Sequence, residues 1–292
     1  MKPGHMKIDL HIHTSTGSDG NLTVEGVFKE AKQRKLDLIS VTDHDSIAAQ
    51  ERAVALARDH GIDYITGVEL NVTFSYPGGG SISLDFLGYN FDIKNRALND
   101  KLQLMRQHRE DRACRILENL NTEFAKEDIP GLTMEDLEQM QEGVDGALGR
   151  PHIADYLIKR GIVSDRQEAF DKYLVRCDVP KYPLLLAEAS ELIKNAGGKI
   201  VLAHPNDPNG TSLIGLTSDL TEQTRIIEEH MLEFIDGVEC WHSRNDAETT
   251  EHYIGFCQKH GLLMTGGSDC HQKPVILGTV DIPDFVAEQF MG

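Results

Sequence analysis

Two histidines lie two residues apart at the end of the first apolar run of the chain, in the segment Asp9-Leu10-His11-Ile12-His13. On an extended segment, side chains at positions i and i+2 point to the same face. Imidazole nitrogens are common ligands of divalent ions such as zinc, manganese and iron. The spacing of His11 and His13 therefore predicts a pair of ligands for one metal ion.

More histidines and carboxylates follow later apolar runs. Each has an ordinary explanation on its own: Asp19-Gly20 is typical of a turn, Asp43 could cap the next helix, and a histidine near a strand end is often only a hydrogen-bonded polar residue. Their joint occurrence near the ends of successive strands favours a centre that holds several metal ions. The candidate metal ligands are His11, His13, Asp19, His44, Glu69, Asp85, His204, Asp269 and His271.

Short apolar strands alternate with amphipathic helices in the first and last parts of the chain. Strands are expected at 7–10, 38–42, 64–68, 81–89, 199–203, 236–240 and 262–265, and helices at 23–35, 46–61, 187–196, 221–234 and 247–260. Strands separated by helices at this spacing indicate parallel βα units, and (β/α) barrels carry their active sites at the C-terminal ends of the strands. The pattern predicts an α/β fold with about seven barrel strands.

The middle of the chain has a different character, because residues 93–185 contain helical patterns and no evident strand. One long helix is expected at 96–126 and a shorter one at 133–141. Two further helices are expected to begin at Pro151 and at Ser164, which forms a capping box with Gln167. We therefore expect a discontinuous barrel domain, 1–92 plus 186–292, and a helical insertion domain, 93–185.

Composition excludes several classes of protein. The 292 residues carry a formal net charge of −18, which argues against a stable partnership with long nucleic acid, although bound divalent ions would still let a pocket take a small anionic substrate. No apolar run is long enough to span a membrane and no leader is evident. Five scattered cysteines without a CxxC pair are typical of reduced thiols, so a cytoplasmic location is expected.

The ordered motifs resemble those of the PHP (polymerase and histidinol phosphatase) family, and the resemblance spans nearly the whole chain. The motifs are Asp9-Leu10-His11-Ile12-His13, Ser18-Asp19-Gly20, Thr42-Asp43-His44-Asp45, Gly67-Val68-Glu69, Ala203-His204-Pro205 and Gly267-Ser268-Asp269-Cys270-His271. The resemblance implies a distorted (β/α)7 barrel of the PHP type with two or three divalent metal ions, of which manganese, iron and zinc are expected and magnesium is compatible.

The resemblance also implies a distribution of ligands among the metal ions. The first ion would take His11, His13, Glu69 and Asp269, the second Asp19, His44 and His271, and the third would share Glu69 and take His204. Two positions depart from the family pattern. Asp85 stands where many relatives have histidine, so the third ion is in question, and Gln272 stands where relatives often have glycine.

The insertion motif Gly149-Arg150-Pro151-His152-Ile153-Ala154 resembles the cap of PHP phosphoesterases that act on nucleotides, in which the arginine reaches the phosphate. A guanidinium offers a planar fork that matches phosphate oxygens. The alternative is that Arg150 only anchors its loop. The further candidate substrate contacts are His152, Asn206, His242 and Arg244.

These residues predict a phosphatase that hydrolyses a phosphomonoester of a nucleotide, either a 3′,5′-nucleoside bisphosphate or a nucleoside monophosphate, by attack of a metal-bound hydroxide. Arg150 would balance phosphoryl charge, and His204 or His271 would assist the leaving oxygen if not bound to metal. The alternatives are a 5′-to-3′ exonuclease on short RNA, a histidinol-phosphate phosphatase, or a non-catalytic metal-binding regulatory module.

Overall fold

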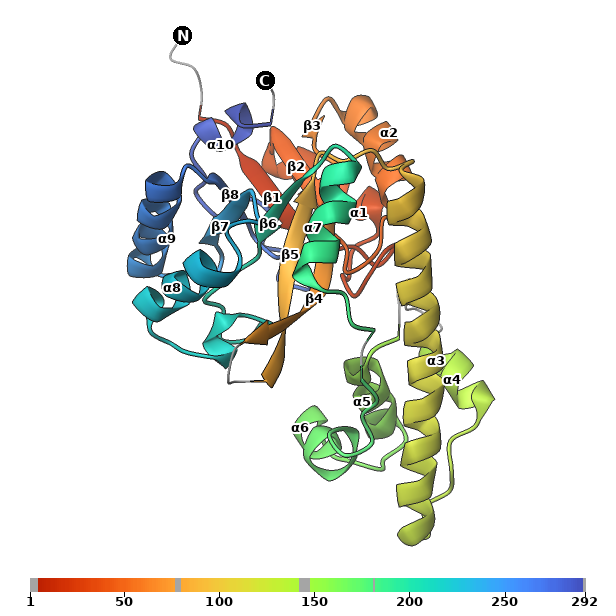
Figure 1. Cartoon of the computed structure of the whole chain (residues 1–292). Helices are drawn as coiled ribbons and strands as arrows, with labels where there is room; N and C mark the ends of the chain where they lie inside the picture. The colour runs from red at the N-terminus through yellow and green to blue at the C-terminus, as the bar shows by residue number, and fades with distance from the viewer. Residues whose placement is uncertain (1–4, 77–79, 142–147, 181, 291–292) are drawn as a thin grey trace. The chain divides into compact units, whose positions relative to one another are not determined.

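The computed structural model describes residues 5–76, 80–141, 148–180 and 182–290 and has a mixed α/β fold (Figure 1). The chain forms two compact units. The first, called here the α/β unit, combines Met1–Asn99 with Pro183–Gly292, and the second, called the helical unit, is Asp100–Tyr182. Among the described residues, no helix is both long and apolar enough to cross a membrane.

The strands of the α/β unit form two sheets. The first has the order β1 (Ile8–Ile12), β2 (Leu38–Val41) and β3 (Asp63–Tyr64), and the second has the order β4 (Gly67–Tyr76), β5 (Gly80–Tyr89), β6 (Lys199–Leu202), β7 (Gly237–His242) and β8 (Leu263–Gly267). Single bridges, Ile12 to Cys270 and His44 to Glu69, are the recorded pairings between these sheets. The sequence had suggested a barrel. The two sheets are not closed into one barrel by continuous ladders of hydrogen bonds.

The β4–β5 hairpin departs from the parallel pairing that is expected where helices separate the strands. The predicted strand at 64–68 is divided, because β3 ends at Tyr64 and a new strand runs on from Gly67. That strand pairs antiparallel with β5 along its whole length, and β5 pairs antiparallel with β6. The signal was present in the sequence, since the buried residues Leu70, Val72 and Phe74 alternate with polar ones, as expected of a strand with one face in the core.

The helices of the α/β unit are α1 (Val24–Arg34), α2 (Gln50–His60), α7 (Leu186–Asn195), α8 (Leu220–His230), α9 (Ala247–His260) and α10 (Phe285–Glu288), with the 3-10 turn η2 (Leu213–Gly215). Thr23 caps α1 by accepting from the amide of Gly26. The helix α2 starts four residues later than predicted, because Ser46 bonds locally to the amide of Ala48 instead of capping it. Gly61 ends α2 with φ of 65°, as the sequence predicts.

The helical unit contains most of α3 (Arg96–Lys126) together with α4 (Met134–Gln141), α5 (Arg150–Lys159), α6 (Arg166–Ala169) and the π-helical turn η1 (Phe170–Leu174). Its described residues include no strand. The unit has a core of its own, in which Phe124 packs edge-on against Tyr173 at a centroid distance of 5.1 Å. The predicted capping box shifts by one residue: Asp165 caps α6, and Glu168 accepts from Ser164.

Candidate metal centre

Most candidate ligands lie near or beyond the ends of strands, as predicted, but Asp85 lies inside β5. His11 lies within β1, His44 follows β2, Glu69 lies near the start of β4, and His204 follows β6. The loop after β8 can approach β1 closely because position 267 is glycine, where a Cβ atom would lie 2.4 Å from the backbone nitrogen of His11. Side chains from distant parts of the sequence therefore meet above one set of strand ends.

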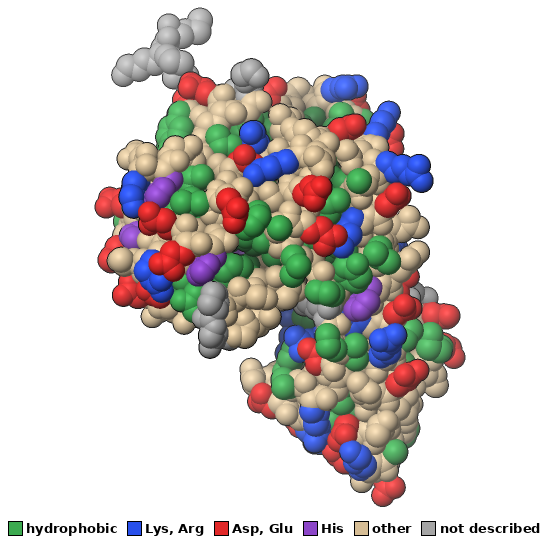
Figure 2. Space-filling view, in the orientation of Figure 1, with side chains coloured by type: hydrophobic (Ala, Val, Ile, Leu, Met, Phe, Trp, Pro, Cys, Tyr) green, Lys and Arg blue, Asp and Glu red, His purple; other side chains and the backbone are tan. Residues whose placement is uncertain are grey.

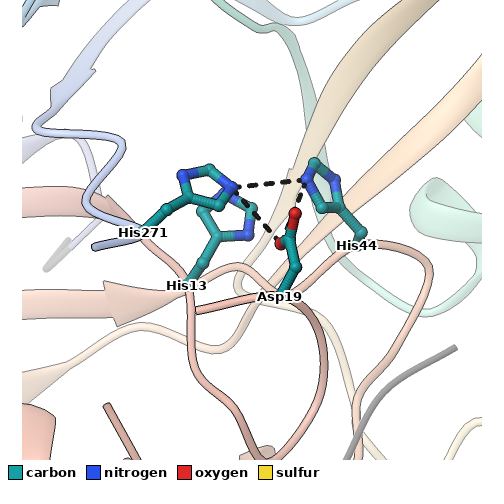
Figure 3. Close-up of side chains that lie close together, drawn as sticks. All are labelled: His13, Asp19, His44 and His271. Atoms are coloured by element: carbon teal, nitrogen blue, oxygen red, sulfur yellow. Dashed lines mark hydrogen bonds and ion pairs between the residues drawn. The ribbon is translucent and has the colours of Figure 1, made fainter. Parts of the chain in front are cut away.

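Histidine nitrogens and carboxylate oxygens form four groups in which all donor atoms lie within 4.8 Å of one another; three of them consist of predicted ligands, and the fourth is Asp207, His242 and Asp269. Figure 3 shows the first group, in which Asp19 Oδ1 lies 3.4 Å from His271 Nε2 and 3.7 Å from His44 Nε2. His13 belongs to the first and second groups and His11 to the second and third, so these three groups are contiguous. The three groups of predicted ligands are His13, Asp19, His44 and His271; His11, His13 and Asp269; and His11, Glu69 and His204.

Two buried carboxylates lie between these histidines. Glu69 Oε2 is 2.8 Å from His44 Nδ1 and 3.3 Å from His13 Nε2, and Asp269 Oδ1 is 3.3 Å from the same His13 atom. Neither oxygen has a hydrogen-bond partner of acceptable geometry among the described residues. A buried carboxylate oxygen is costly without a partner. The donor set of imidazoles and carboxylates therefore fits divalent ions such as manganese, iron or zinc.

The carboxylates also control the protonation of the histidines. Burial alone would lower the pKa of His44, but the negative charge of Glu69 raises it to about 10. Burial likewise opposes the charged form of His204, while its bond to Glu69 raises the pKa to about 9. His13 behaves in the opposite way, because burial and the neighbouring His271 and His44 lower its pKa to about 3. Without metal, His44 and His204 carry protons at neutral pH.

These shifts predict that metal uptake releases protons. An imidazole must lose its proton before it can bind a metal ion, and His44 and His204 hold theirs up to pKa values of about 10 and about 9. The apparent affinity for Mn²⁺ should therefore increase with pH between about 6 and 8, by on the order of tenfold per pH unit for each proton displaced. Titration of metal-free protein in weakly buffered solution with an indicator dye measures the release, and a pH-independent affinity would contradict it.

Asp85 lies beside the centre but outside the three groups. Its Oδ2 is 4.0 Å from His204 Nε2. Its carboxylate already accepts hydrogen bonds from Asn71, at 2.6 Å, and from the hydroxyl of Thr211. Burial and the nearby charge of Glu69 raise the pKa of Asp85. Each carboxylate oxygen of Asp85 accepts one of these bonds and has a second lone pair, so a role as a ligand stays compatible with both partners.

Arg244 joins the centre through two carboxylates, the candidate ligand Asp269 and Asp207, which the sequence analysis did not single out. Its guanidinium donates from Nε to Asp207 Oδ2 at 2.9 Å and from one terminal nitrogen to Asp269 Oδ2 at 2.6 Å. His242 Nε2 is buried 3.5 Å from the same Asp269 oxygen. Arg244 thereby supplies positive charge next to the candidate ligands, and its side chain remains about one-third exposed.

The other predicted substrate contacts already have structural partners. The amide of Asn206 donates to Thr249 and accepts from Gln223. His152 Nδ1 accepts from the backbone amide of Gly149 at the start of α5, so at least one ring nitrogen serves to cap that helix.

Arg150, in the helical unit, lies over the ring of Phe170 at 5.5 Å, and one of its terminal nitrogens is 2.7 Å from Asp178 Oδ2. The same carboxylate also pairs with Arg112. Two guanidinium groups therefore share a single acidic partner, which leaves positive charge at this position of the helical unit. Both the phosphate contact and the loop anchor predicted for Arg150 remain compatible with this arrangement.

Three buried carboxylates next to the ligands were missed by sequence reasoning. Glu239 on β7 contacts both His11 and His204. Asp9 accepts from the backbone amides of Ser268 and Gly278. Asp43 binds Thr14 and Ser18, and burial raises its pKa to about 6. For Asp9 and Glu239, the available signal was a carboxylate inside an apolar strand, which must have a partner there.

Similarity to known proteins agrees with this geometry. The chain is 31% identical over 273 residues to the 5′-3′ exoribonuclease Rnm of Escherichia coli, covering 90% of this chain and 85% of that protein. It is 30% identical over 273 residues to a 3′,5′-nucleoside bisphosphate phosphatase of Chromobacterium violaceum, covering 90% and 87%.

A solved structure described as a metal-dependent phosphoesterase from Bifidobacterium adolescentis superposes with a TM-score of 0.78 at 27% identity, covering 99% of this chain and 97% of that one. A family model for the PHP domain matches residues 9–178, more than half of the chain. The chain belongs to the PHP domain family.

Proposed function

We propose that this PHP enzyme, a metal-dependent phosphoesterase, removes a phosphate group from a nucleotide, with a 3′,5′-nucleoside bisphosphate as the preferred substrate class. The observation that carries the proposal is the pair of buried oxygens Glu69 Oε2 and Asp269 Oδ1, which are surrounded by histidine nitrogens and have no hydrogen bond of acceptable geometry among the described residues. The substrate class rests on the 30% identity to the bisphosphate phosphatase. We further propose that the two sheets together form the distorted PHP barrel around this centre.

Two or three divalent ions would be held by the three groups of donors. When bound, such ions activate water as a nucleophile and stabilise negative charge on phosphoryl oxygens. The residues of the chain itself would bind these ions and orient the substrate. His204 and His271 would serve as metal ligands and not as proton donors to the leaving oxygen. The Nε2 atom of each ring belongs to a donor group and would be occupied by metal.

Positive side chains would then orient the phosphate. Arg244 lies beside Asp269, and its guanidinium can share its donors between that carboxylate and a phosphate oxygen. Figure 2 shows acidic side chains spread over the face in view, with no broad basic surface there of the kind that long nucleic acid requires. The net charge of −18 likewise favours a small substrate or the end of a short one.

A 5′-to-3′ exonuclease activity on short RNA is the second candidate, because the chain is 31% identical to an enzyme of that name. The two activities differ in the bond that is cleaved, a phosphomonoester or a phosphodiester. A panel containing a 3′,5′-bisphosphonucleotide, a nucleoside monophosphate, histidinol phosphate and a 5′-phosphorylated RNA oligonucleotide would separate them by kcat/KM. A preference for the oligonucleotide would replace the substrate proposed above.

Chelation tests the metal dependence on which both activities rest. Removing divalent ions should reduce the hydrolysis of the best substrate to background. Without these ions, nothing would activate the attacking water or stabilise the charge on the phosphoryl oxygens. Mn²⁺ added to the metal-free protein should restore at least part of the rate. Full activity in protein shown by elemental analysis to be free of metal would contradict the proposal.

A further inference from the structure

Glu239 is a buried carboxylate that touches two candidate ligands from different strands. It lies on β7, the strand next to β6 in the second sheet (Figure 1), and its side chain is fully buried. Its Oε1 is 3.0 Å from His11 Nδ1, and its Oε2 accepts from the backbone amide of His204 at 2.8 Å. Both of its oxygens are therefore used, and each contacts a different candidate ligand of the centre.

The contact with His11 determines which ring nitrogen can bind metal. A carboxylate at Nδ1 favours the tautomer that carries its proton there, which leaves a free lone pair on Nε2. His11 Nε2 points towards the centre, 3.4 Å from Glu69 Oε1 and 3.4 Å from Asp269 Oδ1. The position of Glu239 thus matches the requirement that His11 offers Nε2 as a ligand.

The contact with His204 fixes a backbone conformation that a residue with a side chain rarely adopts. His204 has φ of 24°, in the region that favours glycine. The hydrogen bond from its amide to Glu239 supports this conformation, in which His204 Nε2 lies 3.0 Å from Glu69 Oε1. One side chain therefore orients a ligand in each of two donor groups.

We infer that Glu239 is a positioning residue that couples the His11–His13–Asp269 group to the His11–Glu69–His204 group. The inference rests on the proposed metal centre. Glu239 touches neither Asp19, His44 nor His271 in any recorded contact among the described residues. Loss of its carboxylate should thus weaken the two groups that contain His11 and spare the group drawn in Figure 3.

Glu239→Gln is the informative substitution because glutamine has one acceptor and one donor where glutamate has two acceptors. If its oxygen faces His204, its amide nitrogen faces His11 Nδ1, and the ring proton must move to Nε2, where it blocks metal binding. If its oxygen faces His11, two donors meet at the strained His204 amide. We expect the affinity of the affected positions to fall by about 10- to 100-fold.

Equilibrium dialysis against Mn²⁺, followed by elemental analysis of the protein, measures the effect. At the same free Mn²⁺ concentration, Glu239→Gln should retain fewer ions per chain than the wild type, and Glu239→Asp should retain an intermediate number. The control is Glu248→Gln, which changes an exposed glutamate on α9 and should retain as many ions as the wild type. Equal Mn²⁺ retention by folded Glu239→Gln would overturn the inference. Failure of the wild type itself to bind Mn²⁺ would instead overturn the proposed centre.

A second measurement needs no variant and remains decisive if Glu239→Gln does not fold. In the Zn²⁺-loaded wild-type protein, long-range ¹H–¹⁵N spectra of the histidine rings should place the proton of His11 on Nδ1 and the metal on Nε2. A proton on Nε2, or metal on Nδ1, would overturn the role of Glu239.

Discussion

Asp269→Asn is expected to reduce kcat/KM by about 10³-fold, because a neutral amide replaces the carboxylate next to three candidate ligands. Asp269 Oδ1 lies within 3.4 Å of ring nitrogens of His11, His13 and His271 and has no hydrogen bond of its own. An asparagine at this position could neither balance the charge of a divalent ion nor replace both oxygens. Steady-state kinetics together with the metal content of the purified variant measure the effect.

The matched control is Asp59→Asn, which makes the same chemical change at an exposed position near the end of α2. It should leave both kcat/KM and metal content unchanged. The interpretation of Asp269 would be contradicted if Asp269→Asn kept the wild-type rate and metal content while remaining folded by circular dichroism.

Arg150→Ala is expected to raise KM by about 10-fold or more while leaving the metal content unchanged. A charge-assisted hydrogen bond to a phosphate is worth roughly 1.5–3 kcal/mol, which corresponds to about 10- to 100-fold in binding. Arg150 shares its acidic partner, Asp178, with Arg112, so the pair of guanidinium groups carries an excess of positive charge available to an anion. Kinetics over a range of substrate concentrations separate KM from kcat.

Arg166→Ala provides the matched control, since Arg166 in the same helical unit also pairs with an aspartate, Asp155, at 2.6 Å. It removes an equivalent exposed ion pair and should leave KM unchanged. If Arg150→Ala lowers only the thermal stability and not the apparent affinity for substrate, then Arg150 anchors its loop through Asp178 and Phe170 and does not contact phosphate.

The fold was predicted best where local signals are strong. The long helix α3 has its predicted bounds, and Thr23 and Gly61 cap helices as expected, because these signals depend on residues within a few positions. The hairpin β4–β5 was only partly predicted, because the strand expected at 64–68 is divided and β4 runs on to Tyr76. The alternation of buried and polar residues after Leu70 indicated a strand with one face in the core, but which strands meet in space is not a local property of the sequence.

The candidate centre shows the same division. The types and order of the ligand residues, from His11 to His271, identified the chemistry and the family. The partners that orient those ligands were not evident, because Glu239 lies more than 200 residues from His11 in the sequence and meets it only through a hydrogen bond of 3.0 Å in the folded chain. The engagement of Asp85 with Asn71 and Thr211 was hidden for the same reason.

The sequence by itself determined which groups could bind metal, since imidazole and carboxylate side chains have fixed donor chemistry and the spacing of His11 and His13 on a strand fixes their common direction. Only the tertiary structure decided which donors meet, which oxygens stay without a partner, and which buried carboxylates hold the ligands. These outcomes depend on distances between strands that are remote in the chain, and on burial, which raises the cost of every unpaired charge.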